Sequence, residues 1–523
     1  MCSIHGIILK NEDEPPSFNL SKYLLKSMAI LKHRGPDSSG ILLDEDVIYF
    51  NDFNIDISEY DDSNIGIGHN RLAIVGSATQ PIPNEDESIW TVCNGEIYNY
   101  YDLIDVLDNH KFKTDTDTEV INHAYEEDIL NELDGEYAYG IYDKNLNILI
   151  LRRDTFGVKP LFYIDRKKYF AFSSEKKGLW NILMEYEGLS FKEVYNFPIK
   201  SLPPNSYLTY YIDRHRYDIT EDVKYININY FKTKNKDYNI VLKEVESALW
   251  DAVAKRVREV DRVGIICSGG VDSTLIGKMA SEYSEVVLYS VGIENSEDLL
   301  YATRISEDLG LTLRKKIITP EEYEKYLFNV AYCIDEINLM KIGVGIPIYV
   351  SSEMAKRDGI KVVLSGQGAD ELFGGYNRYL RILKENGAEE LKKTLYYDIL
   401  KIHKNNLERD DHCTMANSVE LRVPFLDDNL VEIALSLPVR YLIDENVRKK
   451  ILRDIASKYL PEYIAYRPKK AAQYGSGGEK IVYAVAKKYG YSKKNINKFF
   501  EEILFEKVKE RYENTINNII NNI

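Results

Sequence analysis

The stretch IICSGGVDSTLIGKMA, residues 265–280, decides the fold of the second half of the chain. It continues an apolar strand predicted at residues 263–267, passes through a glycine-bearing turn and ends in an amphipathic helix. Gly269 and Gly270 have no Cβ, so backbone N–H groups in the turn can approach a phosphate oxygen closely. A glycine turn between a strand and a helix of any α/β protein is the alternative interpretation.

Ser268 and Ser273 add hydroxyl donors to this turn, and the positive end of the helix points to the same place. Asp272 would repel an anion there unless a cation is also bound, which predicts Mg²⁺ between its carboxylate and the phosphates. The segment differs from the GxxxxGK[ST] P-loop because no lysine follows. SGGVDS resembles the pyrophosphate-binding loop of the ATP pyrophosphatases, which implies that ATP is cut between its α and β phosphates.

The sequence on both sides of this loop alternates between helices and strands. Strands are predicted at 286–292 and 311–318, and helices at 241–257, 297–309 and 321–334. Repeated strand–helix–strand units predict a parallel sheet with right-handed crossovers and a ligand at the carboxyl ends of its strands. Contacts to adenine and ribose are expected from the ends of the first two strands: Ile266, Val291 and Gly292.

The stretch KVVLSGQGADELFGGY, residues 361–376, supplies a second polar loop. A buried strand ends at Ser365 and Gly366, which we expect to complete the ATP site. Asp370 follows, and Asp272 and Asp370 together predict a shared magnesium site, because carboxylates from two strand ends around one hard cation suit Mg²⁺. The alternative is that Asp370 and Glu371 cap the following helix.

Bulk properties exclude several classes of protein. A chain of 523 residues, 44% hydrophobic and 29% charged, predicts two globular domains. A net charge of −16 without a long basic run argues against nucleic acid or an anionic membrane as a partner. Five cysteines without a CxxC pair indicate neither a disulfide framework nor a zinc site. The absence of a signal-like segment or a long apolar run predicts a cytoplasmic protein without membrane spans.

The chain begins MCSIHGII, so removal of Met1 would expose Cys2 with both a thiol and an α-amine of pKa about 8. That amine can act as the base for its own thiol. The alternative is that Cys2 is a small buried residue on a first strand. Its position alone favours the buried residue, and the later segments change that balance.

Six further segments follow: HRGPDSSG (33–40), IGIGHNRLAIVG (65–76), WTVCNGEIYNY (90–100), TDTDTEVI (114–121), LDGEYAYGIYD (133–143) and LRRDTFGVKPLFY (151–163). Their alternating and apolar runs predict strands, and residues 20–31 and 119–125 predict helices outside them. In this order the segments resemble a class II glutamine amidotransferase domain of the N-terminal-nucleophile hydrolase fold. Together with SGGVDS they resemble the glutamine-hydrolysing asparagine synthetase family over nearly the whole chain.

The resemblance implies an αββα sandwich over residues 1–220 and a parallel-sheet, adenine-nucleotide α-hydrolase-like synthetase domain over 237–523. It implies an AMP-forming amide ligase with glutamine, aspartate and ATP as substrates and Mg²⁺ as cofactor. Glutamine would supply ammonia, a β-aspartyl-AMP intermediate would form, and pyrophosphate would be released. The oligomeric state is left open, with a homodimer among the options.

The resemblance also implies roles for residues of the glutamine site. Cys2 is the nucleophile, and the side chain of Asn94 and the N–H of Gly95 are donors to the developing oxyanion. Arg71 suits the α-carboxylate of glutamine through its planar fork, and Asp117 suits the ammonium, although the two could form a surface ion pair instead. The rest of the predicted pocket comprises Glu96 and backbone groups of Leu72, Ala73, Ile74 and Val75.

Two positions of the synthetase domain carry further expectations. Lys469 matches a family lysine that stabilises charge on the transferring phosphoryl group, or it belongs to a solvated basic turn. At Gln367 much of the family has glutamate, which is linked to formation of the acyl-adenylate. Glutamine cannot accept a proton, so its role is orientational, another group takes the proton, or the acceptor differs.

Two rival functions remain open. One is a glutamine-dependent amidotransferase of the same family that acts on a different carboxylate, which Gln367 alone supports. The other is a regulatory or binding homologue with a decayed site. The intact SGGVDS, Asp370 and Lys469 argue against decay.

Overall fold

The computed structural model describes residues 2–10, 19–221, 233, 236–444, 447–468 and 476–520. The chain forms two compact units, Met1–Asp222 with Phe505–Ile523, and Val223–Leu504. We call them unit 1 and unit 2. Within the described residues, no helix is long and apolar enough to cross a membrane.

Unit 1 contains two antiparallel sheets. In spatial order, the first comprises β11 (Lys200–Ser201), β9 (Phe162–Asp165), β10 (Tyr169–Ser173), β1 (Ser3–Leu9), β4 (Ile65–Arg71), β2 (Ser38–Leu43) and β3 (Asp46–Phe50). The second comprises β13 (Arg216–Glu221), β12 (Ser206–Tyr211), β8 (Ile148–Arg153), β7 (Gly135–Asp143), β6 (Ile89–Ile97) and β5 (Ile82–Pro83). Apolar side chains of both sheets, among them Ile4, Ile67, Val92 and Leu151, meet in one core.

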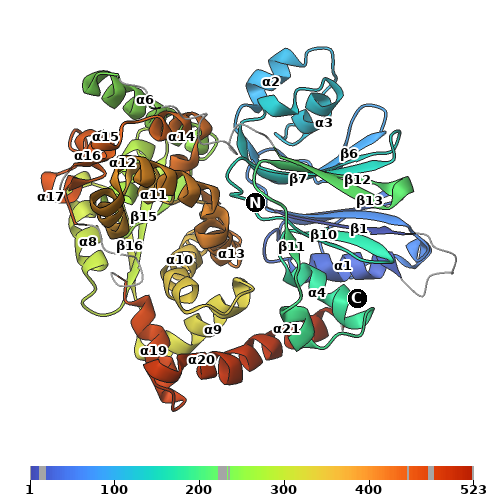
Figure 1. The fold of residues 1–523 in the computed structure, drawn as a ribbon. Coiled ribbons are helices and arrows are strands. Elements are labelled where there is room, and N and C mark those ends of the chain that lie inside the picture. Colours follow the sequence, from blue (N-terminus) through green and yellow to red (C-terminus); the bar gives the residue numbers. More distant parts are fainter. Residues whose placement is uncertain are drawn as a thin grey trace. The chain divides into compact units, whose positions relative to one another are not determined.

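Helices cover the outer faces of these sheets. Helices α1 (Leu20–Ile30) and α4 (Lys177–Glu185) pack on the first sheet, and α2 (Tyr100–Val106) and α3 (Glu119–Glu126) pack on the second. Figure 1 shows the resulting four layers. The predicted αββα sandwich of the N-terminal-nucleophile hydrolase type is therefore confirmed.

Helix α21 (Phe505–Ile520) also belongs to unit 1, whereas the sequence analysis assigned it to the second domain. Its aromatic residues explain the position: Tyr512 packs on Trp180 with ring centroids 5.2 Å apart, and Phe505 packs on Phe191 at 5.5 Å. Burial of these large rings stabilises the return of the chain end to unit 1. The short helix α5 (Phe191–Tyr195) provides part of the docking surface.

Unit 2 is built on a sheet whose strands are all parallel, in the order β16 (Thr312–Ile317), β15 (Glu285–Gly292), β14 (Arg262–Ile266), β17 (Val362–Leu364) and β18 (Glu420–Arg422). Strand β14 therefore lies between β15 and β17, where the strand order reverses. In open α/β sheets the ligand binds at the carboxyl ends of the strands at this switch point. The predicted parallel sheet is confirmed, and both glycine loops found in the sequence follow strands at the switch point.

The helices of unit 2 surround this sheet. Those that precede β17 are α6 (Tyr238–Val257), α7 (Val271–Ala280), α8 (Glu297–Leu309), α9 (Tyr323–Cys333) and α10 (Leu339–Arg357). Those that follow are α11 (Ala369–Phe373), α12 (Asn377–Leu400), α13 (Glu408–Met415), α14 (Asp428–Leu435), α15 (Val439–Leu442), α16 (Lys450–Ala456), α17 (Glu462–Ala465), α19 (Gly478–Lys488) and α20 (Ile496–Phe499). A small hairpin pairs β19 (Ile443–Asp444) with β20 (Val447–Arg448).

Candidate active sites

Cys2 directly precedes β1 and is buried, with 7% of its surface exposed. Its backbone N–H donates a 3.0 Å hydrogen bond to Asn94 Oδ1. Its carbonyl oxygen accepts from Nε of Arg34 at 3.0 Å, and Arg34 also pairs with Glu175 at 2.8 Å in a fully buried ion pair. The backbone of Cys2 is therefore held from both sides. Arg34 received no role from the sequence alone, although it lies in the HRGPD motif that signals it.

Asn94 lies on β6, and the amide nitrogen of its side chain is available to bind a ligand. Its amide Nδ2 is buried and has no hydrogen-bond partner in the described part of the chain. Gly95 follows, and a Cβ there would lie 2.2 Å from the carbonyl oxygen of Glu136 on β7, so only glycine allows the two strands to approach. The arrangement leaves an amide donor beside Cys2, as an oxyanion site requires.

Arg71 ends β4, at the same edge of the first sheet as Cys2, because Ser3 on β1 pairs with Asn70 on β4. Its guanidinium donates to the carbonyl oxygens of Val75 at 3.3 Å and Gly76 at 2.5 Å, so the loop after β4 curls around it.

The backbone of this loop is already engaged in part. Ala73 donates its N–H to Asp37 Oδ2 at 2.8 Å, and Val75 accepts from Arg71. Leu72 is buried, and Ile74 is half-buried. Of the backbone groups predicted to line the glutamine pocket, the N–H of Ala73 and the carbonyl of Val75 therefore hold the loop itself.

Asp117 and Glu96 are both buried, at 5% and 4% exposure. Asp117 Oδ2 accepts from the N–H of Ile97 at 2.8 Å, which joins the segment before α3 to β6. Burial, followed by the charges of Asp117, Cys2 and Glu96, raises the pKa of the Cys93 thiol well above its ordinary value. These two carboxylates and Cys2 therefore all lie near Cys93, and the carboxylates form a negative region that suits an ammonium group. Because Arg71 is also buried, a surface ion pair does not describe these residues.

Two buried histidines lie on the strands next to Cys2, β1 and β4. His5 on β1 bridges the hydroxyls of Ser3 and Ser27, both at 2.9 Å, and His69 on β4 contacts the carbonyl of Cys93 at 3.1 Å. Burial lowers the pKa of each to about 3. Both imidazoles are therefore neutral at pH 7 and contribute hydrogen bonds rather than charge.

The phosphate-type loop lies between β14 and α7. Gly269 has φ of 67°, and a Cβ there would lie 2.7 Å from Cβ of Tyr301. Gly270 caps the start of α7, and Asp272 and Ser273 are buried in its first turn. Arg467, which had no assigned role, fixes the loop by donating to the carbonyl of Ser268 at 2.9 Å.

Lys449 connects the two carboxylates predicted to share magnesium. Its Nζ lies 2.6 Å from Asp272 Oδ2 and 2.5 Å from Asp370 Oδ1, and only 1% of its side chain is exposed. Gly375 makes room for the contact, because a Cβ there would lie 1.9 Å from Asp370 Oδ1 and 2.2 Å from Lys449 Cε. One cation therefore reaches both carboxylates at once. No local sequence signal identified Lys449, because Asp272 lies 177 residues away.

The pocket over the loop is basic as well as acidic. Its lining includes Asp272, Asp298, Lys449, Arg453 and Arg467. Arg467 pairs with Asp298 at 3.2 Å, and Arg453 donates to the carbonyl of Ala465 at 2.6 Å. Three cations therefore surround the place where the sequence predicted phosphates. Lys469 lies outside the described residues.

The loop after β17 contacts the loop after β14, because a Cβ on Gly366 would lie 2.9 Å from Asp272 Cβ. Ser365 donates its N–H to the carbonyl of Arg422 at 3.1 Å. Ile266 ends β14, and Val291 and Gly292 end the adjoining β15, so the residues predicted for adenine and ribose lie at the carboxyl edge of the sheet.

Gln367 is held by its side-chain amide. Nε2 donates to Asp410 Oδ2 at 2.5 Å, and Oε1 accepts from Asn406 at 3.4 Å. Asn406 also donates to Glu371 Oε1 at 3.1 Å. Burial, with Asp370 beside it, raises the pKa of Glu371 to about 7. Burial also raises the pKa of Asp410, against the attraction of Arg409.

Comparison with known proteins covers both halves of the chain. Residues 56–212 match the family model described as glutamine amidotransferase domain, and residues 244–389 and 383–512 match the model described as asparagine synthase. The chain belongs to the asparagine synthetase family. A Methanocaldococcus jannaschii protein assigned as glutamine-hydrolysing asparagine synthetase 1 is 57% identical, with 98% of this chain and all of that protein covered.

Members of the family with lower sequence identity also match most of this chain. Glutamine-hydrolysing asparagine synthetase 1 of Bacillus subtilis is 30% identical, with 85% of this chain and 83% of that protein covered. Asparagine synthetase B of Escherichia coli is 29% identical, with 91% and 83% covered. Both halves of this chain therefore have counterparts within single family members.

Proposed function

We propose that the protein synthesises asparagine from aspartate and ATP with ammonia released from glutamine. The observation that carries this proposal is the Cys2–Asn94 pair, because its buried amide Nδ2 is a donor that glutamine hydrolysis would use. The loops that carry Asp272 and Asp370 supply the second half of the reaction.

In unit 1, loss of Met1 would turn the backbone nitrogen of Cys2 into an amine held by Asn94 Oδ1. This amine takes the thiol proton, and the sulfur attacks the side-chain carbonyl of glutamine. Asn94 Nδ2 and the N–H of Gly95 stabilise the oxyanion. The C–N bond breaks, ammonia leaves with a proton from the amine, and water hydrolyses the thioester to glutamate. Arg71 and Asp117 select free glutamine by its opposite charges.

In unit 2, a side-chain carboxylate oxygen of aspartate attacks the α phosphorus of ATP and pyrophosphate leaves. Ammonia attacks the acyl carbon of the resulting β-aspartyl-AMP, a proton is lost, and AMP leaves with the former carboxylate oxygen. Activation is needed because a carboxylate is a poor acyl donor. Lys449, Arg453 and Arg467 line the pocket over the loop, where Lys449 and Arg467 also pair with aspartates. Lys469 stays a prediction for stabilising charge on the transferring phosphoryl group.

Asp272 and Asp370 are the residues that would hold Mg²⁺. The fit rests on geometry, since a single ammonium, Lys449 Nζ, lies within 2.6 Å of both carboxylates, and oxygen donors suit this cation. When bound, the ion would offset the charge of the phosphates.

The test is a product assay with purified protein. With aspartate and ATP, glutamine and ammonium chloride should each give asparagine, AMP and pyrophosphate in equal amounts. ADP in place of AMP, or no asparagine from either nitrogen source, would contradict the proposal. A panel of other carboxylates that released AMP faster than aspartate does would favour the rival acceptor.

A further inference from the structure

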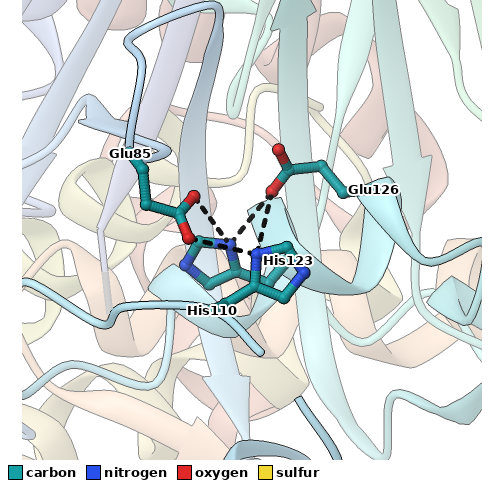
Figure 2. Close-up of side chains that lie close together, drawn as sticks. All are labelled: Glu85, His110, His123 and Glu126. Atoms are coloured by element: carbon teal, nitrogen blue, oxygen red, sulfur yellow. Dashed lines mark hydrogen bonds and ion pairs between the residues drawn. The ribbon is translucent and has the colours of Figure 1, made fainter. Parts of the chain in front are cut away.

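A second group of metal-ligating side chains lies in unit 1, outside both sites. Glu85 lies in the loop between β5 and β6, His110 in the segment between α2 and α3, and His123 and Glu126 on α3. Figure 2 shows the two imidazoles stacked between the two carboxylates. One potential ligand atom from each residue lies within 4.8 Å of the others. We propose that these four residues bind Zn²⁺ in a structural site.

The spacing of the ligand atoms matches a tetrahedron around zinc. His110 Nδ1 lies 3.1 Å from Glu85 Oε1 and 3.7 Å from Glu126 Oε2. His123 Nδ1 lies 3.0 Å from Glu126 Oε2 and 3.5 Å from Glu85 Oε2. Zinc bonds of about 2.0–2.1 Å in tetrahedral geometry separate neighbouring ligand atoms by about 3.3–3.4 Å. The nitrogen–oxygen distances lie on both sides of that value, but Glu85 meets His110 through Oε1 and His123 through Oε2, so its carboxylate would have to turn to bring one oxygen to the ion.

The far nitrogens of both imidazoles supply an independent observation. His110 Nε2 lies 3.2 Å from Glu127 Oε1, and His123 Nε2 lies 3.7 Å from the buried carboxylate of Glu119. A histidine that binds a metal through one nitrogen usually donates its other N–H to a carboxylate or carbonyl, which fixes the ring and its tautomer. His110 has this outer partner at hydrogen-bond distance, whereas His123 Nε2 is buried without a hydrogen bond in the described residues and faces the carboxylate of Glu119.

Charge and donor type point to the same ion. Four carboxylates surround two imidazoles, so even two protonated rings would leave negative charge in excess. A dication offsets that excess. Two nitrogens with two oxygens favour zinc over Mg²⁺, which prefers oxygen ligands alone. The carboxylates of Glu85 and Glu126 are 33% and 26% exposed, whereas His123 is buried, so an ion can enter from solvent and be held at depth.

The site would join three segments: the loop between β5 and β6, the segment between α2 and α3, and α3 itself. With all ligands from the protein, it has no open position for a substrate, which is typical of structural zinc. The chain between His110 and His123 carries Asp117, which we placed in the glutamine pocket. Zinc would therefore stabilise the segment that presents this carboxylate.

The test uses the full chain, stripped with a chelator and dialysed against Zn²⁺ with excess Mg²⁺ to protect the nucleotide site. After dialysis, wild type should retain one equivalent of zinc more than the double variant, which combines His110→Gln and Glu126→Gln. Glu127→Gln removes only an outer partner, so it should weaken zinc binding by about 10–100-fold. Glu132→Gln, an exposed glutamate outside the cluster, is the control and should bind like wild type.

Co²⁺ provides a second readout, because a tetrahedral site gives intense visible absorption and an octahedral one does not. Wild type should show this absorption and the double variant should lack it. Added Zn²⁺ should raise the melting temperature of wild type but not that of the double variant. Equal zinc content in wild type and double variant, or an octahedral cobalt spectrum, would overturn the proposal. If the double variant does not fold, unchanged zinc affinity in Glu127→Gln would overturn it instead.

Discussion

Replacing Gln367 by glutamate tests how the side-chain amide at this position is held. The amide of Gln367 donates to Asp410 at 2.5 Å, and Asp410 is only 1% exposed. Gln367→Glu would put two carboxylates in contact. At about 3 Å and an effective dielectric constant of about 20, their repulsion is about 5 kcal/mol. Arg409, 2.6 Å from Asp410, would soften this value.

Proton uptake by one of the two carboxyl groups limits the loss of folding stability and makes that loss depend on pH. Protonating a carboxyl of ordinary pKa about 4.3 costs about 5 kcal/mol at pH 8 but only about 2 kcal/mol at pH 6. The pair has a raised pKa in the folded protein, so the loss of stability is full above that pKa and disappears as pH falls toward the unfolded value. Urea unfolding should therefore show Gln367→Glu as clearly less stable than wild type at pH 8 and closer to it at pH 6.

Two further variants make this prediction specific. Adding Asp410→Asn to Gln367→Glu should restore most of the stability, because the repulsive pair is gone. Asn405→Asp adds a charge at an exposed neighbouring position and should have little effect. Pyrophosphate release measured with ammonia as the nitrogen source would report on the synthetase site alone, because ammonia makes glutamine hydrolysis unnecessary. Wild-type stability of Gln367→Glu at pH 8, or no rescue by Asp410→Asn, would refute the reasoning.

Four other predictions test the remaining groups. Cys2→Ala should abolish asparagine synthesis from glutamine but spare synthesis from ammonia, and loss of both would contradict separate sites. Asn94→Ala should lower kcat with glutamine by about 100–1000-fold, the usual cost of one oxyanion donor, with an unchanged ammonia-dependent rate as the check. Asp272→Asn should stop pyrophosphate release with either nitrogen source, so persistent release would remove the carboxylate from the mechanism. On going from pH 7 to pH 5, His5 and His69 should each lower the free energy of unfolding of unit 1 by about 2 kcal/mol. The unfolded imidazole gains a proton near pH 6.5, whereas the folded one, with a pKa of about 3, stays neutral. Urea unfolding at both pH values measures this difference, and equal stability at the two would contradict it.

Local patterns in the sequence predicted much of the fold. The predicted helix 297–309 is observed as α8, and the predicted strands 263–267, 286–292 and 311–318 differ from β14, β15 and β16 by a residue or so at their ends. These elements are short and strongly patterned, so local periodicity was sufficient. The two glycine loops could be paired in advance because parallel strands end at one edge of a sheet.

Long-range partners could not be predicted in the same way. Arg34, Lys449 and Asp410 reach their partners across many residues, and nothing in their own segments indicates which carboxylate or carbonyl they meet. Nor does any pattern within residues 505–520 name the surface of unit 1 on which α21 packs. The spacing of the cysteines predicted no zinc site. His110 and His123 lie close to Glu85 through the packing of the second sheet and α3, which no local pattern indicates.

The charges around the phosphate-type loop explain why two aspartates lie where an anion should bind. Lys449, Arg453 and Arg467 carry three positive charges, and Asp272, Asp298 and Asp370 carry three negative ones, so the groups balance without a ligand. A triphosphate entering this balanced pocket would bring an uncompensated charge into a partly desolvated place. A dication held by Asp272 and Asp370 would offset part of that charge. This balance supports the proposal that the two aspartates are its ligands, since a buried ion pair alone adds little stability and does not by itself explain two carboxylates beside a phosphate-type loop.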